Sequence, residues 1–323
     1  MRMNCINVRE IGSFAMETGS VVPPGPEEIL VKVEWTGLCR TDLKLIREGH
    51  RDLTLPRIPG EEAVGIICET GMAVHDYHIG DRVYLYPGIW CGECPACRTG
   101  AENLCRKMQI MGFHRDGGFA EYVTSPAKSA IRVPEGLSAE EAVFTEPLSC
   151  CLNALELGGA GQGKRIAIWG AGPAGILLNR LARAMGAEPL NIEPDERRRE
   201  RIGGRLATGG ELFDICVVAV GSKDAYGEAL KSLSPRGRLV VFSGLRPTEA
   251  SVAVDFNNLH YREGCIVGAY GCCYRHGVDA LNYISAGKVP VADLISHRLP
   301  LEALEQGLAL VERREGIKIL LKP

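Results

Sequence analysis

The sequence lacks both a strong net charge and a long apolar segment. Its 323 residues include 37 Lys and Arg against 40 Asp and Glu, which gives a net charge of −3. That balance offers no basic surface for nucleic acid and no polybasic anchor for a membrane. The sequence has no unbroken apolar run of about 18 residues, and its N-terminus lacks the apolar core of a signal peptide. We therefore expect a cytoplasmic protein that contacts neither nucleic acid nor membranes.

A complete set of disulfides is also excluded, because the chain has 13 cysteines, an odd number. Metal binding explains so many cysteines in a cytosolic protein better than disulfides do. Two adjacent pairs, Cys150 with Cys151 and Cys272 with Cys273, suggest redox chemistry at first sight. Cysteine also packs as a small apolar residue, and the first pair lies in the helical pattern LSCCLNAL. We favour that interpretation for both pairs.

Four cysteines lie together in the loop CGECPACRTGAENLC, which is broken by glycine and proline. They are Cys91, Cys94, Cys97 and Cys105, separated by two, two and seven residues. Thiolates at these spacings can surround one tetrahedral ion. Because the set contains no histidine and leaves no open position, it predicts a closed structural zinc site. An iron–sulfur cluster is an alternative that four cysteines alone do not exclude.

The chain is long enough for two domains, and its pattern of predicted strands and helices changes near residue 154. Before that point, alternating strands such as EEILVKVE (27–34) and IGDRVYLYP (79–87) are joined by Gly- and Pro-rich turns. After it, buried strands alternate with helices, which predicts an α/β domain with a Rossmann-type, doubly wound parallel sheet. We expect that domain at 154–271, and a β-rich first domain made of 1–153 and 272–323.

The α/β domain opens on KRIAIWGAGPAG (164–175), which predicts a strand, a glycine turn and a helix. Gly170 permits the tight turn, Gly172 lets a pyrophosphate approach the backbone, and Gly175 lets the helix pack against the strand. Pro173 and Ala174 open the helix, whose N-terminal amides and dipole favour phosphate. The stretch therefore predicts a dinucleotide site.

Glu193 ends the next predicted strand, where a carboxylate can accept hydrogen bonds from both hydroxyls of the adenosine ribose. A carboxylate there repels a 2′-phosphate, so the sequence favours NAD over NADP. Three arginines follow, Arg197, Arg198 and Arg199. They either grip a 2′-phosphate or form a solvated helical turn, and we favour the turn. Arg198 is kept as a candidate cofactor contact.

Several short motifs follow one another along the whole chain: GLCRTD (37–42), PGEEAVG (59–65), GDRV (80–83), the cysteine loop, EPL (146–148) and GAGPAG (170–175). This ordered series resembles the zinc-containing medium-chain dehydrogenases, which include alcohol, sorbitol and threonine dehydrogenases. The resemblance implies a GroES-like first domain and hydride transfer between NAD and a secondary alcohol. A polyol, sugar derivative or amino alcohol is the implied substrate class. It also implies a homodimer or homotetramer.

The resemblance assigns roles to individual residues. It implies that Cys39 is a ligand of a catalytic zinc and that Glu146 is a further ligand of the same ion. Thr41 matches the hydroxyl that passes the substrate proton. Arg40 and Lys318 fall where relatives contact the cofactor pyrophosphate.

One position departs from the family pattern. Relatives usually read Gly-His-Glu where this chain reads Gly60-Glu61-Glu62, and their histidine binds the zinc. Cys39, Glu61 and Glu146 together would leave the site at −1, a weaker Lewis acid than a neutral set. Three outcomes are open: Glu61 binds the zinc in place of the histidine, Glu62 binds it instead, or the site holds no metal. We favour a site that retains zinc.

Two rival functions stay open. One is a reductase without catalytic zinc, in which a carboxylate acts as acid and base. The other is a non-catalytic NAD-binding sensor. The stretch between Glu193 and Phe213 is also shorter than in the family, which predicts that the nucleotide fold lacks a strand or a helix.

Overall fold

The computed structural model describes residues 1–207 and 209–323, and it divides into two compact units. Unit 1 is Met1–Glu146 with Cys273–Pro323, and unit 2 is Pro147–Cys272. The expected boundary at residue 154 lies inside helix α4 (Thr145–Gly158), which begins in unit 1 and continues in unit 2. Among the described helices, none is long and apolar enough to cross a membrane.

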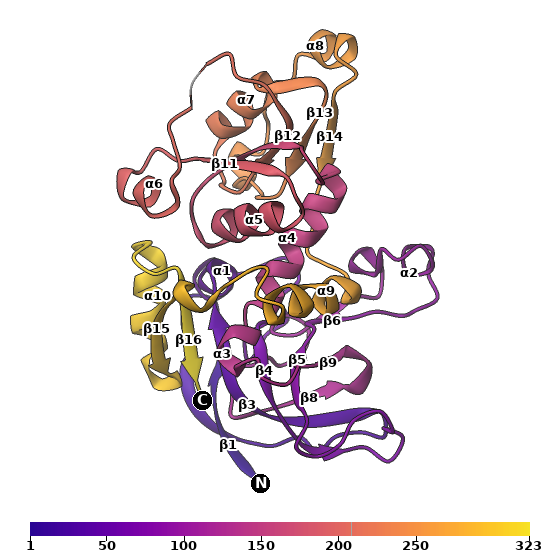
Figure 1. Cartoon of the computed structure of the whole chain (residues 1–323). Helices are drawn as coiled ribbons and strands as arrows, with labels where there is room; N and C mark the ends of the chain where they lie inside the picture. Colours follow the sequence, from indigo (N-terminus) through magenta and orange to yellow (C-terminus); the bar gives the residue numbers. More distant parts are fainter. Residues whose placement is uncertain (208) are drawn as a thin grey trace. The chain divides into compact units, whose positions relative to one another are not determined.

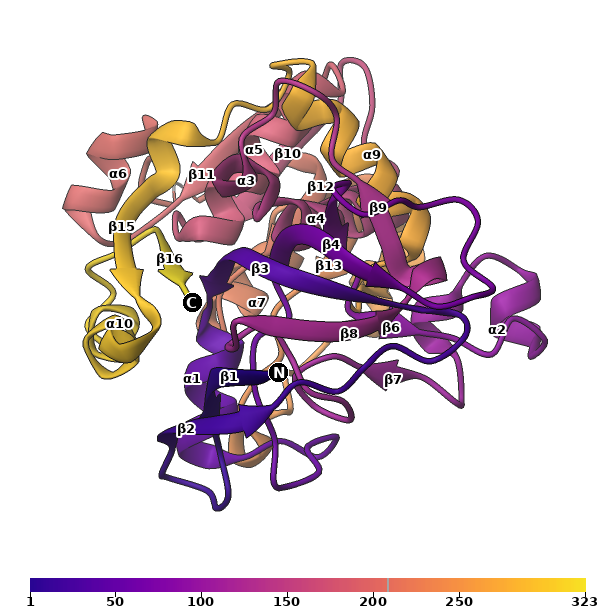
Figure 2. The same ribbon diagram turned by 90° about the horizontal axis from the view of Figure 1, so that it is seen from below.

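Unit 1 is built on a seven-stranded sheet in the order β15-β16-β3-β4-β5-β9, with β8 paired to β3 (Figure 1). Figure 2 shows β3, β4 and β8 lying side by side. The strands of this sheet are β3 (Glu28–Leu38), β4 (Ala63–Thr70), β5 (Arg82–Leu85), β8 (Tyr122–Pro126), β9 (Ala130–Arg132), β15 (Ile295–Pro300) and β16 (Lys318–Lys322). Short pairs are formed by β1 (Arg2–Asn7) with β2 (Ala15–Ser20) and by β6 (Gly88–Ile89) with β7 (Gln109–Ile110).

Two apolar clusters hold unit 1 together. One is formed by β-branched residues of neighbouring strands, among them Val31, Ile67 and Val83, which are fully buried. The other packs α1 (Arg40–Glu48) against α10 (Leu304–Glu312) through Ile46 and Leu308. The remaining helices of unit 1 are α2 (Pro95–Arg98), α3 (Ala139–Ala142) and α9 (Tyr274–Ser285). Burial of this apolar surface fixes the sheet that carries Cys39 and Lys318 at its strand ends.

Unit 2 contains a five-stranded sheet in the order β11-β10-β12-β13-β14, and all its pairs are parallel. Its strands are β10 (Arg165–Trp169), β11 (Glu188–Ile192), β12 (Phe213–Val218), β13 (Leu233–Val241) and β14 (Cys265–Gly268). Its helices, besides α4, are α5 (Pro173–Ala184), α6 (Glu196–Ile202), α7 (Lys223–Lys231) and α8 (Phe256–Tyr261). The prediction of an α/β parallel sheet is thus confirmed, and so is the β-rich first domain.

The short stretch between β11 and β12 lacks a strand in its described residues, as its length predicts. After α6 the chain returns to the sheet edge and makes a single parallel bridge, Ile192 with Arg205. The Arg205 N–H donates to the Asn191 carbonyl, and the Glu193 N–H donates to the Arg205 carbonyl, both at 3.0 Å. One bridge therefore stands where a further parallel strand would extend the sheet beyond β11.

Candidate functional site

The glycine turn after β10 has the geometry that its three glycines predict. Gly170 has φ +114°, a region that favours glycine, and its N–H donates to the Ile192 carbonyl at 2.8 Å. A Cβ at Gly175 would collide with the Gly170 carbonyl, so only glycine lets α5 pack this close to the turn. Apart from its chain neighbours, a Cβ at Gly172 would meet only the Arg198 Nη1 within 4 Å, at 3.9 Å. The backbone of Gly172 is therefore open to a ligand.

Asn191 holds this turn closed. Its side chain lies in β11 and the residue is 1% exposed. The amide Nδ2 donates to the carbonyls of Gly170 at 2.7 Å and Gly175 at 3.0 Å, while Oδ1 accepts from Asn179 at 2.6 Å. Sequence reasoning did not name Asn191. The available signal was a polar residue in the middle of the otherwise apolar run PLNI, which needs buried partners.

Glu193, the candidate ribose contact, lies directly beside the glycine turn. The residue is 6% exposed, and its carboxylate accepts from the Ala171 N–H at 2.7 Å and the Asp195 N–H at 3.1 Å. Two backbone donors fix the direction of the carboxylate before any ligand arrives. The structure therefore brings Glu193 and the glycine turn together, and the predicted contact of Glu193 with the ribose stays a prediction.

The three arginines that follow do not act as one group. Arg199 donates through Nη1 to the carbonyls of Glu193 and Pro194, so it closes the start of α6. Arg197 is exposed. Arg198 is half-buried and lies beside Gly172. The solvated-turn interpretation therefore fits Arg197 alone, because Arg199 has a structural partner and Arg198 faces the glycine turn.

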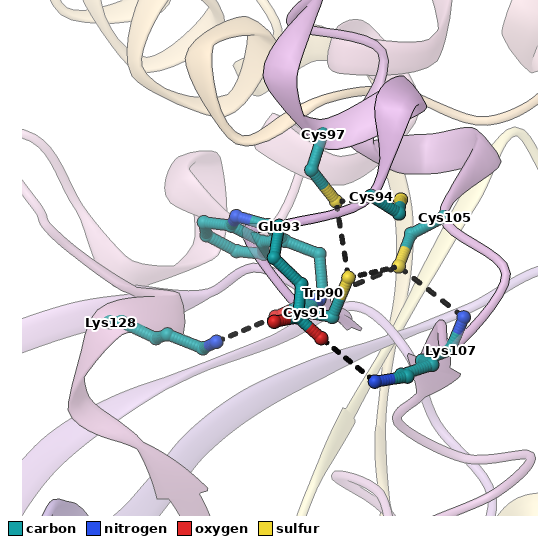
Figure 3. A network of polar contacts seen from close by, with 8 residues as sticks. All are labelled: Trp90, Cys91, Glu93, Cys94, Cys97, Cys105, Lys107 and Lys128. Carbon is teal, nitrogen blue, oxygen red and sulfur yellow. Dashed lines mark hydrogen bonds and ion pairs between the residues drawn. The ribbon is translucent and has the colours of Figure 1, made fainter.

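The loop cysteines gather around one point, with their sulfurs turned toward one another (Figure 3). The Sγ atoms of Cys91 and Cys97 lie 3.9 Å apart, those of Cys94 and Cys97 3.4 Å, and those of Cys91 and Cys105 3.5 Å. A hydrogen bond from the Glu93 backbone N–H is the main cause that lowers the pKa of the Cys91 thiol. A hydrogen bond from the Cys97 backbone N–H is the main cause that lowers the pKa of the Cys94 thiol, to about 6. Thiols with lowered pKa values supply thiolates for a cation.

These separations fit a single tetrahedral ion. With Zn–S bonds of about 2.3 Å, tetrahedral geometry places the sulfurs of a zinc site about 3.8 Å apart. A disulfide would need about 2.05 Å. In an iron–sulfur cluster the thiolates bind different iron atoms, which spreads their sulfurs further apart than one shared ion does. The geometry of Cys91, Cys94, Cys97 and Cys105 therefore favours zinc over a cluster.

A second group of ligand-type residues forms in unit 1 where three strands meet. Strand register pairs Ile319 of β16 with Leu38 of β3, and Thr36 of β3 with Ala63 of β4. Lys318 directly precedes Ile319, Glu62 directly precedes Ala63, and Cys39 directly follows Leu38. All three residues therefore lie at the same end of the sheet. The Gly37 N–H donates to the Glu62 carbonyl at 2.9 Å, which extends the ladder to this end.

Glu62 and Lys318 form an ion pair in the interior. Their side chains are 2% and 5% exposed, and the Lys318 ammonium contacts the Glu62 carboxylate directly. A Cβ at Gly37 would collide with that carboxylate, so the glycine makes room for the pair. Burial by itself lowers the pKa of Lys318, yet the nearby Glu62, Cys39 and Glu146 raise it overall. Lys318 therefore stays charged, with a partner that the sequence did not reveal, and its predicted contact with pyrophosphate stays a prediction.

Cys39 and Glu61 form a second contact, close to the pair of Glu62 and Lys318. The Cys39 Sγ is 3.9 Å from the Glu61 Oε1, and both residues are half-buried. Burial and the carboxylates of Asp42, Glu62 and Glu61 raise the pKa of the Cys39 thiol well above its usual value, while Lys318 opposes them. So many acidic groups around one lysine make a site that favours a further cation.

The structure gathers some predicted zinc ligands more closely than others. Glu146 is the second residue of α4 and is near enough to Lys318 to raise its pKa. In the part of the chain that the structure describes, however, Cys39, Glu61 and Glu146 do not form a set whose ligand atoms all lie within 4.8 Å, as the loop cysteines do. The donor chemistry fits zinc for the pair Cys39 and Glu61, and the third ligand stays a prediction.

Helix α1 positions the remaining candidates. Cys39 is its N-cap residue, and the Cys39 N–H donates to the Asp42 carboxylate at 2.9 Å. Arg40 and Thr41 occupy the first turn with exposed side chains. Exposure leaves both side chains accessible to a ligand, and their predicted contacts stay predictions.

Known proteins resemble this chain over nearly its full length. Residues 25–135 match the alcohol dehydrogenase GroES-like domain family. The chain is 33% identical to the L-threonine 3-dehydrogenase of Pyrococcus abyssi, with 86% of each protein covered. It is 26% identical to the L-galactonate-5-dehydrogenase of Escherichia coli, with 98% of each covered.

The fold gives the same result. A protein of Sinorhizobium meliloti described as a zinc-binding dehydrogenase, whose structure holds NADP, superposes with a TM-score of 0.92 at 29% identity, over the whole of both chains. The motif series, the parallel nucleotide-binding sheet, the cysteine loop and these relatives all agree. The chain belongs to the zinc-containing medium-chain dehydrogenases and is an NAD(P)-dependent oxidoreductase of that family.

Proposed function

We propose that the protein oxidises a secondary alcohol with NAD⁺ at a zinc held by Cys39, Glu61 and Glu146. The observation that carries this proposal is the 3.9 Å distance between the Cys39 Sγ and the Glu61 Oε1. With Zn–S of about 2.3 Å and Zn–O of about 2.1 Å, a tetrahedral ion separates two such donors by about 3.6 Å. A small adjustment of either side chain would let both bind one ion.

The Lys318 contact supports Glu61 over Glu62 as the carboxylate that replaces the family histidine. Glu62 is already neutralised by Lys318, and freeing it would leave a buried ammonium without its partner. Glu61 lies outside that buried ion pair, and its carboxylate faces the Cys39 sulfur at 3.9 Å. The set of Cys39, Glu61 and Glu146 carries one negative charge more than a set with histidine, and Lys318, which already neutralises Glu62, lies near Cys39 and Glu146.

Bound zinc supplies a Lewis acid that lowers the pKa of an alcohol oxygen, and NAD⁺ supplies the hydride acceptor. The chain's own residues do the rest. The Thr41 hydroxyl, exposed on the first turn of α1, accepts the substrate proton and passes it toward solvent. Cys39 and Glu61 would hold the zinc in place, and the zinc would supply the position at which the alcohol oxygen binds. The substrate class is a polyol, a sugar derivative or an amino alcohol, in line with the relatives named above.

NAD is the preferred cofactor in this proposal. The fixed carboxylate of Glu193 can accept from the ribose hydroxyls and repels a 2′-phosphate. The relative from Sinorhizobium meliloti holds NADP, so the preference needs a direct test. We further propose that the protein is cytoplasmic and forms a homodimer or homotetramer. For assembly, β14 is the edge strand of the unit 2 sheet and offers its unpaired side to a second copy.

Metal analysis and an activity screen test the proposal together. Purified protein should hold two zinc ions per chain and reduce NAD⁺, followed by absorbance, with some member of a panel of polyols, sugars and amino alcohols. The variants Cys39→Ser and Glu61→Ala should each retain one zinc and lose turnover. Glu69→Ala, an exposed carboxylate of β4, is the matched control and should keep both. Two zinc ions in the Glu61→Ala protein would refute the ligand assignment.

A reductase without catalytic zinc is the second candidate. It is favoured by the fact that Glu146 does not join Cys39 and Glu61 within 4.8 Å among the described residues. In that case the wild type holds one zinc, still reduces a ketone with NADH, and loses this activity when its acid carboxylate is replaced by glutamine. A sensor without chemistry would bind the dinucleotide and transfer hydride to no member of the panel. The histidine variant Glu61→His would then gain turnover.

A further inference from the structure

We propose that Glu146, Cys150 and Cys272 form a binding site for a soft, thiophilic cation, in addition to the site of the loop cysteines. The ligand atoms of these three residues, one carboxylate oxygen and two sulfurs, all lie within 4.8 Å of one another. Among the described residues, the only other group gathered in this way is the set of loop cysteines. Cys272 is buried and Cys150 is half-buried, and both belong to unit 2.

Helix α4 carries two of the ligands on one face. Glu146 and Cys150 are four residues apart in this helix, so their side chains lie one turn above the other. Asn153, three residues further along, lies on the same face and is 7% exposed. Its amide Nδ2 donates to the Gly271 carbonyl at 2.9 Å. Because Gly271 directly precedes Cys272, this hydrogen bond holds the third ligand against α4.

Each adjacent cysteine pair divides between two environments. Cys151 is fully buried, and its Sγ lies 3.8 Å from a backbone carbonyl in the first turn of α5. Cys273 contacts the cysteine loop, where its Sγ donates to the Asn103 Oδ1 at 3.1 Å. Packing as a small apolar residue therefore explains Cys151. It does not explain why the sulfurs of Cys150 and Cys272 come together beside a carboxylate.

The donor atoms suit a softer cation than the set proposed for catalysis. Both sets have three ligands that can each carry one negative charge, but this one has two thiolates where Cys39, Glu61 and Glu146 have one. Thiolates select soft cations, whereas zinc accepts either set. Tetrahedral bonds of the length found for zinc separate two sulfurs by about 3.8 Å and a sulfur from an oxygen by about 3.6 Å. Shifts of about 1 Å or less would therefore bring all three atoms onto one ion.

Glu146 belongs to both sets, so the two sites cannot be complete at the same time. In the part of the chain that the structure describes, its carboxylate lies with Cys150 and Cys272 and forms no group within 4.8 Å with Cys39 and Glu61. A soft cation would hold Glu146 away from the catalytic zinc and lower turnover. This effect on turnover rests on the proposed function, whereas the binding of the cation does not.

Cadmium is the probe, because its bonds to thiolates absorb in the ultraviolet. Zinc-loaded, full-length protein is kept reduced with a phosphine and titrated with Cd²⁺, and the bound metals are counted by elemental analysis. The wild type should gain one cadmium per chain together with the cadmium–thiolate absorbance. Cys150→Ser and Cys272→Ser each lose one sulfur ligand and should bind this cadmium about 100-fold more weakly. Zinc retained by the loop cysteines shows that each variant is folded.

Cys265→Ser is the matched control, because it removes an exposed thiol of unit 2 and should bind cadmium as the wild type does. Equal uptake by the wild type, Cys150→Ser and Cys272→Ser would place the ion at other cysteines and overturn the inference. A wild type that only exchanges loop zinc for cadmium would overturn it as well.

The same titration followed by NAD⁺ reduction tests the competition for Glu146. Cadmium should inhibit the wild type, and Cys150→Ser and Cys272→Ser should keep their turnover and need about 100-fold more cadmium for the same inhibition. Inhibition that is unchanged in both variants would refute the competition. A wild type that takes up cadmium at these cysteines but transfers no hydride to any substrate would refute the proposed function and support the cation site, which distinguishes the two failures.

Discussion

The buried pair of Glu62 and Lys318 yields a sharp prediction about stability and pH. The perturbation is to remove one partner at a time, with Lys318→Met or Glu62→Leu, and then both together. Because the two side chains are 2% and 5% exposed, the remaining group cannot be solvated in place. Loss of one partner of a buried pair typically costs about 3–5 kcal/mol, while replacing both by apolar groups costs far less.

The pH dependence can be worked out for Lys318, whose pKa the nearby Glu62 carboxylate raises. In Glu62→Leu that support is lost, and Lys318 must lose its proton to stay in the interior, at a cost of at most about 6 kcal/mol at pH 6 and about 3 kcal/mol at pH 8. The destabilisation of Glu62→Leu should therefore shrink as the pH rises.

Local unfolding free energies of both single variants and of the double variant measure the cost and its pH dependence. Hydrogen exchange read by mass spectrometry on peptides of β3 and β16 reports the region of the pair, and peptides of β10 in unit 2 serve as the reference. All samples need the same zinc content, checked by elemental analysis. The double variant should lie within about 1.5 kcal/mol of the wild type and show little pH dependence. Single variants that cost less than about 1 kcal/mol, with no pH dependence in Glu62→Leu, would show that the pair is not buried in solution.

Three further predictions concern other parts of the chain. Cys105→Ser should lose one zinc per chain by elemental analysis and expose the loop 91–105 to protease, because a closed site contributes folding energy. Glu193→Ala should weaken NADH by about tenfold in a fluorescence titration, the equivalent of one hydrogen bond to a charged group, and leave NADPH the same or tighter. The Arg298 guanidinium lowers the pKa of Glu140, so this pair should stabilise the fold above about pH 4.5 and stop doing so as the pH falls through the lowered pKa. Glu140→Gln should cost less than about 1 kcal/mol at pH 7, by thermal melting, since the arginine is half-exposed.

Features written in short stretches of sequence were predictable. The cysteine loop follows from the spacing of Cys91, Cys94, Cys97 and Cys105, since a ring of ligands can close within 15 residues. The parallel sheet follows from apolar runs that alternate with helical patterns, because each run must be covered on both faces. The glycine turn follows from three residues and the strand before them. In each case the information that determines the structure lies within one local segment.

Contacts between distant segments were not predictable in the same way. Lys318 and Glu62 are separated by 256 positions, and only the register of β16 on β3 and of β3 on β4 brings them together. The role of Asn191 likewise depends on the place of β11 beside the glycine turn. A single sequence shows that a buried amide or lysine needs a partner, but not which one. The resemblance to the family predicts that Lys318 contacts the cofactor, whereas the structure shows its ion pair with Glu62.

The same register explains how a site can lose a histidine and keep a coherent set of charges. Two consecutive carboxylates before β4 contact different neighbours. Glu62 therefore turns inward to Lys318, and Glu61 turns to the Cys39 sulfur. A histidine at position 61 would remove one negative charge, while Lys318 would still neutralise Glu62. The exchange of histidine for glutamate thus changes the charge offered to a metal by one unit and leaves the buried pair of Glu62 and Lys318 intact. We therefore expect it to change the affinity for the metal and the pKa of the bound alcohol, and to leave the free energy of unfolding nearly unchanged.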